Sequence, residues 1–162
     1  MRLQVGVIGP GGEVDGQEML IAGRVGRLLA ERSVVVMTGG LDGVMAAAAE
    51  GAAGAGGVVV GVLPGVSHSG GSSDLTVALP TGLGQLRNGL LVGSCHAVIS
   101  VGGSWGTLSE IAIAMRTGVP VVSIGGWQVS DASGTEQYLV RAADAEQAVD
   151  LALDQAARRI SP

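Results

Sequence analysis

The 162-residue sequence contains no lysine and no phenylalanine, and it contains a single cysteine. Without lysine there is no Walker A phosphate loop, no Schiff-base nucleophile and no lysine anchor for pyridoxal phosphate. The lone Cys95 forms no intrachain disulfide and no CxxC motif, and the two histidines, His68 and His96, lack the HxxxH spacing of a helical metal site. We therefore expect no metal site and no oxidising compartment.

Aromatic and charged residues are also scarce. Trp105, Trp127 and Tyr138 are the only aromatic side chains, charged residues make up 14% of the chain, and the net charge is −5. Nucleic-acid binding needs a basic surface and rings for stacking, so this composition argues against a nucleic-acid partner. The most apolar stretch, Gly51–Val66, contains Pro64 and falls short of the roughly 18 continuous apolar residues of a membrane span. The first apolar run is too short for a signal peptide, so we predict a cytoplasmic protein without membrane association.

Short apolar runs rich in β-branched residues alternate with stretches of helical length. Continuous apolar runs are typical of strands that are covered on both faces of a parallel sheet. The predicted strands are Leu3–Ile8, Ser33–Met37, Val58–Leu63, Ala97–Val101 and Val119–Ile124, with a weaker strand at Leu75–Leu79 and an edge strand at Tyr138–Val140. The predicted helices are Val14–Glu31, Gly43–Gly54, Leu83–Ser94, Thr107–Thr117 and Asp144–Arg159.

This alternation predicts a single α/β domain over residues 1–162, Rossmann-like, with a doubly wound parallel sheet and helices on both faces. Asp144 and Gln147 have the spacing of an N-cap and its third-position partner at the start of the last helix. Val66–Asp74, which contains Gly70-Gly71-Ser72-Ser73, is predicted to be a mobile loop.

Glycine supplies 29 residues and gathers where the predicted strands end. The spacing GGxxG occurs twice between a strand and a helix, in Gly39-Gly40-Leu41-Asp42-Gly43 and in Gly102-Gly103-Ser104-Trp105-Gly106, and Gly9-Pro10-Gly11-Gly12 follows the first strand. Glycine lets backbone N–H groups approach a ligand, and a helix start carries unpaired donors that favour an anion. Tight strand-to-helix packing explains any single cluster equally well. Their recurrence at one sheet edge favours a phosphate-bearing ligand there.

Only two charged residues, Arg87 and Glu110, lie between Leu75 and Met115. The spacing Thr107-x-x-Glu110 is that of a capping box, in which the glutamate hydrogen-bonds back to the helix start. The same position also holds the carboxylate beside a ligand of the preceding loop. Arg87 is either an exposed helical residue, a partner of Glu110, or a guanidinium that orients a ribose or a phosphate.

Four other residues have a structural interpretation. Asp42 is predicted to be the N-cap of the helix after the first GGxxG. Asn88 points about 100° away from Arg87 on a helix, so it is not expected to duplicate the contacts of its neighbour. Trp105 either walls a base pocket or packs against the domain, and Cys95 is expected in the core.

The sequence of Gly102–Glu110, GGSWGTLSE, resembles the PGGxGTxxE motif of the LOG (LONELY GUY) family, whose Rossmann-like proteins belong to the SLOG superfamily. Thr38-Gly39-Gly40, with Gly43, Met45, Ala46 and Gly51, is similar to the family's GGGxxGxM block. Arg87 stands where the family carries its arginine, one helix before the motif. The resemblance spans Val5 to Pro120.

In the enzymes of that family, the arginine and the glutamate serve hydrolysis of the bond between base and ribose in cytokinin riboside 5′-monophosphates, which releases ribose 5-phosphate. The resemblance implies that Arg87 positions the sugar phosphate and that Glu110 stabilises cationic charge on the ribose. The further ligand contacts are expected from Gly9, Gly39, Gly40, Gly43, Met45, Asn88, Gly102, Gly103, Ser104, Gly106 and Thr107.

Two positions depart from the pattern of the enzymes. Val101 stands where the motif has proline, and Asn88 stands where the enzymes usually carry a lysine after the arginine. The Arg-Asn pair and the short N-terminal region resemble a bacterial branch that includes the molybdenum-cofactor carrier proteins, which bind a phosphorylated pterin without hydrolysis. Members of both branches are typically dimers or tetramers, so the resemblance implies a homodimer or homotetramer.

Two functional hypotheses follow. The favoured one is a binding protein for a phosphorylated small molecule, either a nucleotide such as a nucleoside monophosphate or a phosphorylated pterin such as the molybdenum cofactor, with no other cofactor required. The alternative is a phosphoribohydrolase that cleaves the N-glycosidic bond of AMP or a cytokinin riboside monophosphate, with Arg87 and Glu110 as catalytic residues. A relative that has lost both roles is a third alternative, because fold alone does not fix function.

Overall fold

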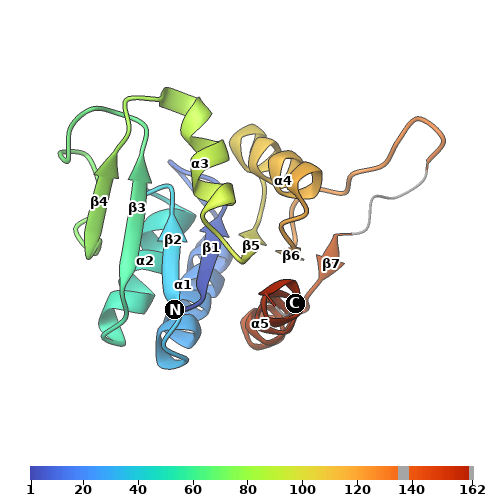
Figure 1. The fold of residues 1–162 in the computed structure, drawn as a ribbon, viewed down its shortest axis with the longest axis horizontal. Coiled ribbons are helices and arrows are strands. Elements are labelled where there is room, and N and C mark those ends of the chain that lie inside the picture. The colour runs from blue at the N-terminus through green and yellow to red at the C-terminus, as the bar shows by residue number, and fades with distance from the viewer. Residues whose placement is uncertain (135–138, 161–162) are drawn as a thin grey trace.

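The computed structural model describes residues 1–134 and 139–160 of the chain. Within these ranges, seven strands form one sheet in the order β4-β3-β2-β1-β5-β6-β7, which Figure 1 shows from left to right. All neighbouring strands run parallel. The strands are β1 (Gln4–Ile8), β2 (Val35–Thr38), β3 (Val59–Leu63), β4 (Val77–Pro80), β5 (Ala97–Val101), β6 (Val121–Ile124) and β7 (Val140–Arg141).

Helices cover both faces of this sheet. They are α1 (Gly16–Glu31), α2 (Val44–Gly54), α3 (Arg87–Gly93), α4 (Trp105–Thr117) and α5 (Ala145–Ile160), with a 3-10 turn η1 (Gly84–Leu86) before α3. Helices α1, α2 and α5 share one buried apolar cluster with the sheet, and α3 and α4 share a second cluster on the opposite face. The predicted doubly wound α/β fold is therefore confirmed.

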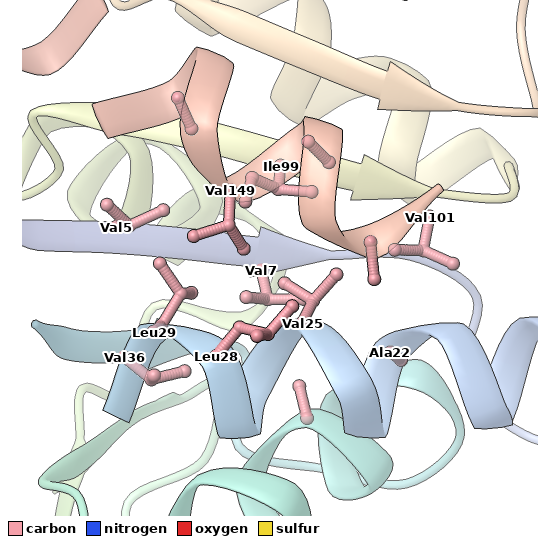
Figure 2. Packing of buried hydrophobic residues seen from close by; sticks show 14 of the residues in the cluster. Val5, Val7, Ala22, Val25, Leu28, Leu29, Val36, Ile99, Val101 and Val149 are labelled. Atoms are coloured by element: carbon pink, nitrogen blue, oxygen red, sulfur yellow. The ribbon is translucent and has the colours of Figure 1, made fainter. Parts of the chain in front are cut away.

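Strand β1 contributes to both clusters. Val5 and Val7 lie in the cluster that holds Val25 of α1 and Val149 of α5, as Figure 2 shows, whereas Ile8 belongs to the cluster of α3 and α4. Successive residues of a strand point to opposite faces, so a strand that is covered on both faces is apolar at every position. This is why the continuous apolar runs predicted the strands.

Most element boundaries agree with the prediction, and the last helix starts as expected. The Gln147 N–H donates to the Asp144 carboxylate over 2.8 Å, and the Gln147 side chain accepts from the Ala143 N–H over 2.7 Å. The predicted edge strand at Tyr138–Val140 is present as β7, although Tyr138 lies outside the described residues.

The predicted helix over Leu83–Ser94 is wrong in its first turn. Residues Gly84–Leu86 form a 3-10 turn, and the α-helix begins only at Arg87. Gly84 has φ +54°, a conformation outside the right-handed helix, and its N–H donates to the Pro64 carbonyl oxygen over 2.9 Å. The tie to Pro64 therefore sets where α3 begins.

Residues 64–76 form an irregular loop between β3 and β4, which confirms a loop at Val66–Asp74. Each helix in the described ranges is too short or too polar to cross a lipid bilayer.

Helices α1 and α2 cross in close backbone contact. A Cβ added at Gly51 of α2 would overlap the carbonyl oxygen of Gly23, and one added at Gly26 of α1 would overlap that of Ala48. The two glycines therefore let the helices approach until backbone meets backbone. This contact fixes the position of α2, whose first turn lies at the candidate site described below.

Replacing Gly51 by alanine is expected to lower the free energy of unfolding by about 2 kcal/mol, because the added methyl meets backbone atoms rather than a movable side chain. Gly54→Ala in the same helix is the matched control, since nothing lies within 4 Å of its added Cβ. That control should gain up to about 1 kcal/mol from better helix propensity. Urea denaturation measures both changes, and equal stability of the two variants would contradict the close helix contact.

Candidate functional site

The loops after β1, β2 and β5 meet α3 around a cavity of about 190 Å³, here called the Arg87 cavity. Strand β1 lies between β2 and β5 in the sheet. The strand order therefore continues from β1 to β4 towards one edge and from β5 to β7 towards the other. In open α/β sheets ligands bind at this switch point, outside the carboxyl ends of the strands. A larger groove of about 630 Å³ lies between α1 and α2, and it holds none of the predicted site residues.

Eight of the predicted site residues line the Arg87 cavity: Gly9, Met45, Arg87, Asn88, Ser104, Gly106, Thr107 and Glu110. They come from four segments that are far apart in the sequence, and all three glycine clusters contribute. The glycine loops thus converge on one place, as the recurrence of the clusters indicated.

Arg87 is buried, with 5% of its surface exposed, and it forms an ion pair with Glu110, which is also 5% exposed. Nη1 of Arg87 lies 3.1 Å from Oε1 of Glu110 and donates to Oδ1 of Asn88 over 2.7 Å. Of the three alternatives for Arg87, the exposed helical residue is wrong and the pairing with Glu110 is confirmed. The remaining alternative, contact with a ligand, is compatible with this pairing, because Nε has no partner among the described residues.

Asn88 connects the guanidinium to α4. Its Nδ2 donates to Oγ of Ser109 over 2.8 Å, and that hydroxyl donates to the Gly106 carbonyl oxygen over 2.7 Å. Asn88 therefore does not duplicate the contacts of Arg87, as expected, but it accepts from Arg87 directly. This chain of hydrogen bonds fixes Arg87 relative to the first turn of α4.

Gly39 leaves the space in which the guanidinium lies. A Cβ at this position would stand 2.5 Å from Sδ of Met45 and 2.6 Å from Nη2 of Arg87. Gly39 does not line the cavity, but it lets Arg87 pack flat against the end of β2. Its role is therefore to position Arg87.

Ser104, Gly106 and Thr107, at the start of α4, line the cavity. Ser104 is the N-cap, its Oγ accepting from the Thr107 N–H over 3.3 Å and lying 3.0 Å from Oγ1 of Thr107. The N–H groups of Trp105 and Gly106 have no partner among the described residues. The predicted capping box of Thr107 and Glu110 is wrong, because the helix starts two residues earlier and the Glu110 carboxylate turns to Arg87.

Asp42 lines the cavity but does not cap α2. The N-cap is Gly43, whose φ is +60°, and no side chain caps this helix end. Oδ1 of Asp42 instead accepts from the Gly12 N–H over 3.0 Å. The predicted N-cap role of Asp42 is therefore wrong, and the carboxylate ties the loop after β2 to the loop after β1.

Four further predicted glycines lie outside the cavity lining, and their surroundings explain why they are glycine. An added Cβ would meet Leu63 and Gly61 at Gly40, the Pro10 carbonyl oxygen at Gly43, the Glu18 carboxylate at Gly102, and the Trp127 ring at Gly103. At these positions the packing interpretation holds.

Four lining residues were not predicted as site residues from the sequence: Gly11, Leu41, Asp42 and Gln85. Gly11 and Leu41 lie within two of the glycine clusters, so their position in a cluster is the signal that could have found them. Gln85 lies in the 3-10 turn before Arg87, and nothing in its spacing distinguishes it. Trp105 does not line the cavity; its ring is 78% exposed and lies 5.0 Å from that of Trp127.

Comparison with known proteins identifies the family of this chain. The model of the SLOG cluster4 family matches residues 2–154. The chain belongs to this family. An uncharacterized protein of Archaeoglobus fulgidus is 47% identical to this SLOG protein over 123 residues, which are 75% of this chain and 80% of the relative.

Two similar solved structures cover nearly the whole SLOG chain. The molybdenum cofactor binding protein of Rippkaea orientalis has 30% identity and a TM-score of 0.85, over 95% of this chain and 97% of that chain. The molybdenum cofactor carrier protein of Chlamydomonas reinhardtii has 29% identity and a TM-score of 0.81, over 97% and 99%. The predicted resemblance to the SLOG superfamily, near the branch with the carrier proteins, is confirmed.

Burial raises the pKa of Glu110 in this SLOG protein from 4.5 to about 7, and the adjacent Arg87 guanidinium lowers it only in part. Desolvation penalises the charged carboxylate, and this effect exceeds the attraction of the cation. At neutral pH the Arg87–Glu110 pair therefore exists in both protonation states, and the charge of the cavity wall changes with pH.

Between about pH 4.5 and pH 7 the folded protein holds the Glu110 proton more tightly than the unfolded chain does. The Glu110 contribution to the free energy of unfolding should fall through this range, by on the order of 3 kcal/mol, and then level off. Glu110→Gln should abolish this fall.

Urea denaturation from pH 4.5 to pH 8 measures the effect as the difference between wild type and variant. Glu146→Gln serves as the control, because Arg24 lowers the pKa of this exposed glutamate. The stability that Glu146 contributes is lost only as the pH falls through that lowered pKa. Parallel profiles of wild type and Glu110→Gln would show that the burial of Glu110 has no such effect.

Proposed function

We propose that this SLOG protein binds a phosphorylated pterin of the molybdopterin type and holds it unchanged, as a binding or carrier protein. The observation that carries the proposal is the buried Arg87, which lines a cavity at the sheet's switch point and whose Nε has no hydrogen-bond partner among the residues that the structure describes. The two similar structures named above, which extend over almost the entire chain, are a molybdenum cofactor binding protein and a molybdenum cofactor carrier protein.

The donor set of the cavity fits a phosphate group. Arg87 supplies a guanidinium, whose planar set of donors suits phosphate oxygens. The Gly106 N–H, which has no partner among the described residues, adds the positive end of the α4 dipole. Glycines 9 and 11 expose the backbone of the loop after β1. Arg87 and the first turn of α4 would hold the phosphate.

Holding a ligand unchanged suits the carboxylates of the cavity. Glu110 is paired with Arg87, and at neutral pH its raised pKa leaves a substantial fraction uncharged, which weakens any stabilisation of a cationic ribose. Oδ1 of Asp42 is occupied by the Gly12 N–H. Both carboxylates are thus engaged in contacts within the protein.

The second candidate function is hydrolysis of the base–ribose bond in a nucleoside 5′-monophosphate. It is favoured by one observation, that Glu110 lines the same cavity as Arg87. AMP and N6-isopentenyl-AMP are the probes, with free base and ribose 5-phosphate as the products measured. Turnover that Glu110→Gln abolishes would replace the binding proposal by the hydrolase, and saturable binding without product supports the binding protein.

Arg87→Ala is expected to weaken the binding of 6-hydroxymethylpterin phosphate by about 100-fold, because the phosphate loses its only cationic partner. Arg87→Lys should recover part of the affinity, since the charge returns without the planar fork. Isothermal titration calorimetry measures both. Arg116→Ala, which removes an exposed arginine at the end of α4, is the matched control and should bind as the wild type does.

Removing Arg87 alone leaves Glu110 buried without its partner, which threatens the fold. The double variant Arg87→Met with Glu110→Gln removes both charges, and its melting temperature shows whether it folds. A folded double variant that binds the pterin phosphate with wild-type affinity would refute the role of Arg87.

A further inference from the structure

A second cavity, of about 270 Å³, lies beside the Arg87 cavity on the side of β3. Leu41 lines both cavities, so the two adjoin at this residue. We propose that this second cavity, here called the loop cavity, binds the fused nitrogen heterocycle of the ligand whose phosphate lies at Arg87. This inference rests on the proposed function.

The walls of the loop cavity are suited to the faces of a planar ring. Leu41, Leu63 and Pro64 form its apolar inner side, and Val66 stands at the rim with 86% of its surface exposed. An apolar side chain this exposed gains free energy when a ring covers it. The Arg87 cavity, by contrast, is lined by charged and polar groups, so the two cavities suit the two parts of one ligand.

Two hydroxyl groups supply the polar contacts. Ser67 and Ser69 line the loop cavity, and their Oγ atoms lie 2.7 Å apart. Each hydroxyl both donates and accepts hydrogen bonds. The edge of a pterin or a purine alternates N–H donors with nitrogen or oxygen acceptors, and such an edge is matched by a pair of hydroxyls. The walls and the hydroxyls together favour a fused two-ring heterocycle over a purely apolar ligand.

The loop that forms this cavity is fixed to the elements that carry the first one. The Gly84 N–H, at the start of the turn before α3, donates to the Pro64 carbonyl oxygen over 2.9 Å. The Ser72 N–H donates to the Gly40 carbonyl oxygen over 2.9 Å, at the end of β2. The two cavities are therefore held in a fixed position relative to each other. A ligand that fills both loses less free energy to ordering of the protein.

Trp105 offers the competing place for a ring, on the other side of Ser104. Its exposed indole lies against Trp127, whose Nε1 donates to the Ser104 carbonyl oxygen over 2.8 Å. These are the only two tryptophans of the chain, so a base that stacks on them changes the whole tryptophan emission. Tryptophan emission therefore reports whether the ring of a ligand binds at Trp105.

The test compares ligands that differ only in the ring. By isothermal titration calorimetry, AMP is compared with ribose 5-phosphate, and 6-hydroxymethylpterin phosphate with methyl phosphate. The loop cavity predicts that at least one ring-bearing ligand binds about tenfold or more tighter than its ringless counterpart. The two pairs also distinguish a purine from a pterin as the preferred heterocycle.

Ser69→Trp fills the loop cavity and should remove this gain, while the affinity for ribose 5-phosphate and methyl phosphate stays within about twofold of wild type. The double variant Ser67→Ala with Ser69→Ala lacks both hydroxyls. It should bind the ring-bearing ligands roughly three- to tenfold more weakly than the wild type does. Ser73→Trp is the matched control, because Ser73 is exposed on the same loop and does not line the cavity.

Two results would overturn the loop cavity as the heterocycle site. One is a ring gain that persists in Ser69→Trp, or no gain for either ring while the ringless phosphates bind. The other is quenching of wild-type tryptophan emission by AMP but not by ribose 5-phosphate, which assigns the ring to Trp105. If the ringless phosphates do not bind at all, the proposed function fails first, and the loop cavity fails with it.

Discussion

The candidate site depends on the buried ion pair between Arg87 and Glu110. A guanidinium with 5% exposure is stable only when its donors are matched, and Glu110 and Asn88 match Nη1 while Gly39 leaves room for the group. Nε of Arg87 is buried without a hydrogen-bond partner among the described residues, and Arg87 lines the cavity. The cation is thus in position before an anion arrives, with a donor available, so binding does not have to pay for moving it. Burial raises the pKa of Glu110 to about 7, so protonation of this carboxyl near neutral pH removes negative charge beside Arg87.

The fold explains why this pair lies where a ligand can reach it. Because β1 stands between β2 and β5, the loops after these three strands meet at the switch point of the sheet and surround a gap there, the Arg87 cavity. Helices α2 and α4 both begin at this gap, and α3 brings Arg87 to it from the face that it shares with α4. The close crossing of α1 and α2 holds one helix start in place, and the Asn88–Ser109 contact ties α3 to the other. Neither the ion pair nor the glycine loops would form this site alone.

The sequence predicted the sheet well because covered strands are apolar at every position, which is a local property. It also identified Arg87 and Glu110, since two isolated charges in an apolar stretch require partners. It failed where the deciding contact is long-range. Gly102 and Gly103 look like ligand-binding glycines, yet Glu18 and Trp127 are what exclude a side chain there. Ser104 and Thr107 are both good caps, and only the position of Arg87 decides that Glu110 turns away from the helix start.

The central claim is that Arg87 and the first turn of α4 hold a phosphate together. A crystal structure of the protein grown with 6-hydroxymethylpterin phosphate tests it most directly. The account predicts a phosphate oxygen within hydrogen-bond distance of Nε of Arg87 and another at the N–H of Gly106, with the Arg87–Glu110 pair intact. A phosphate bound elsewhere on the molecule, with Nε of Arg87 still lacking a partner, would contradict the account.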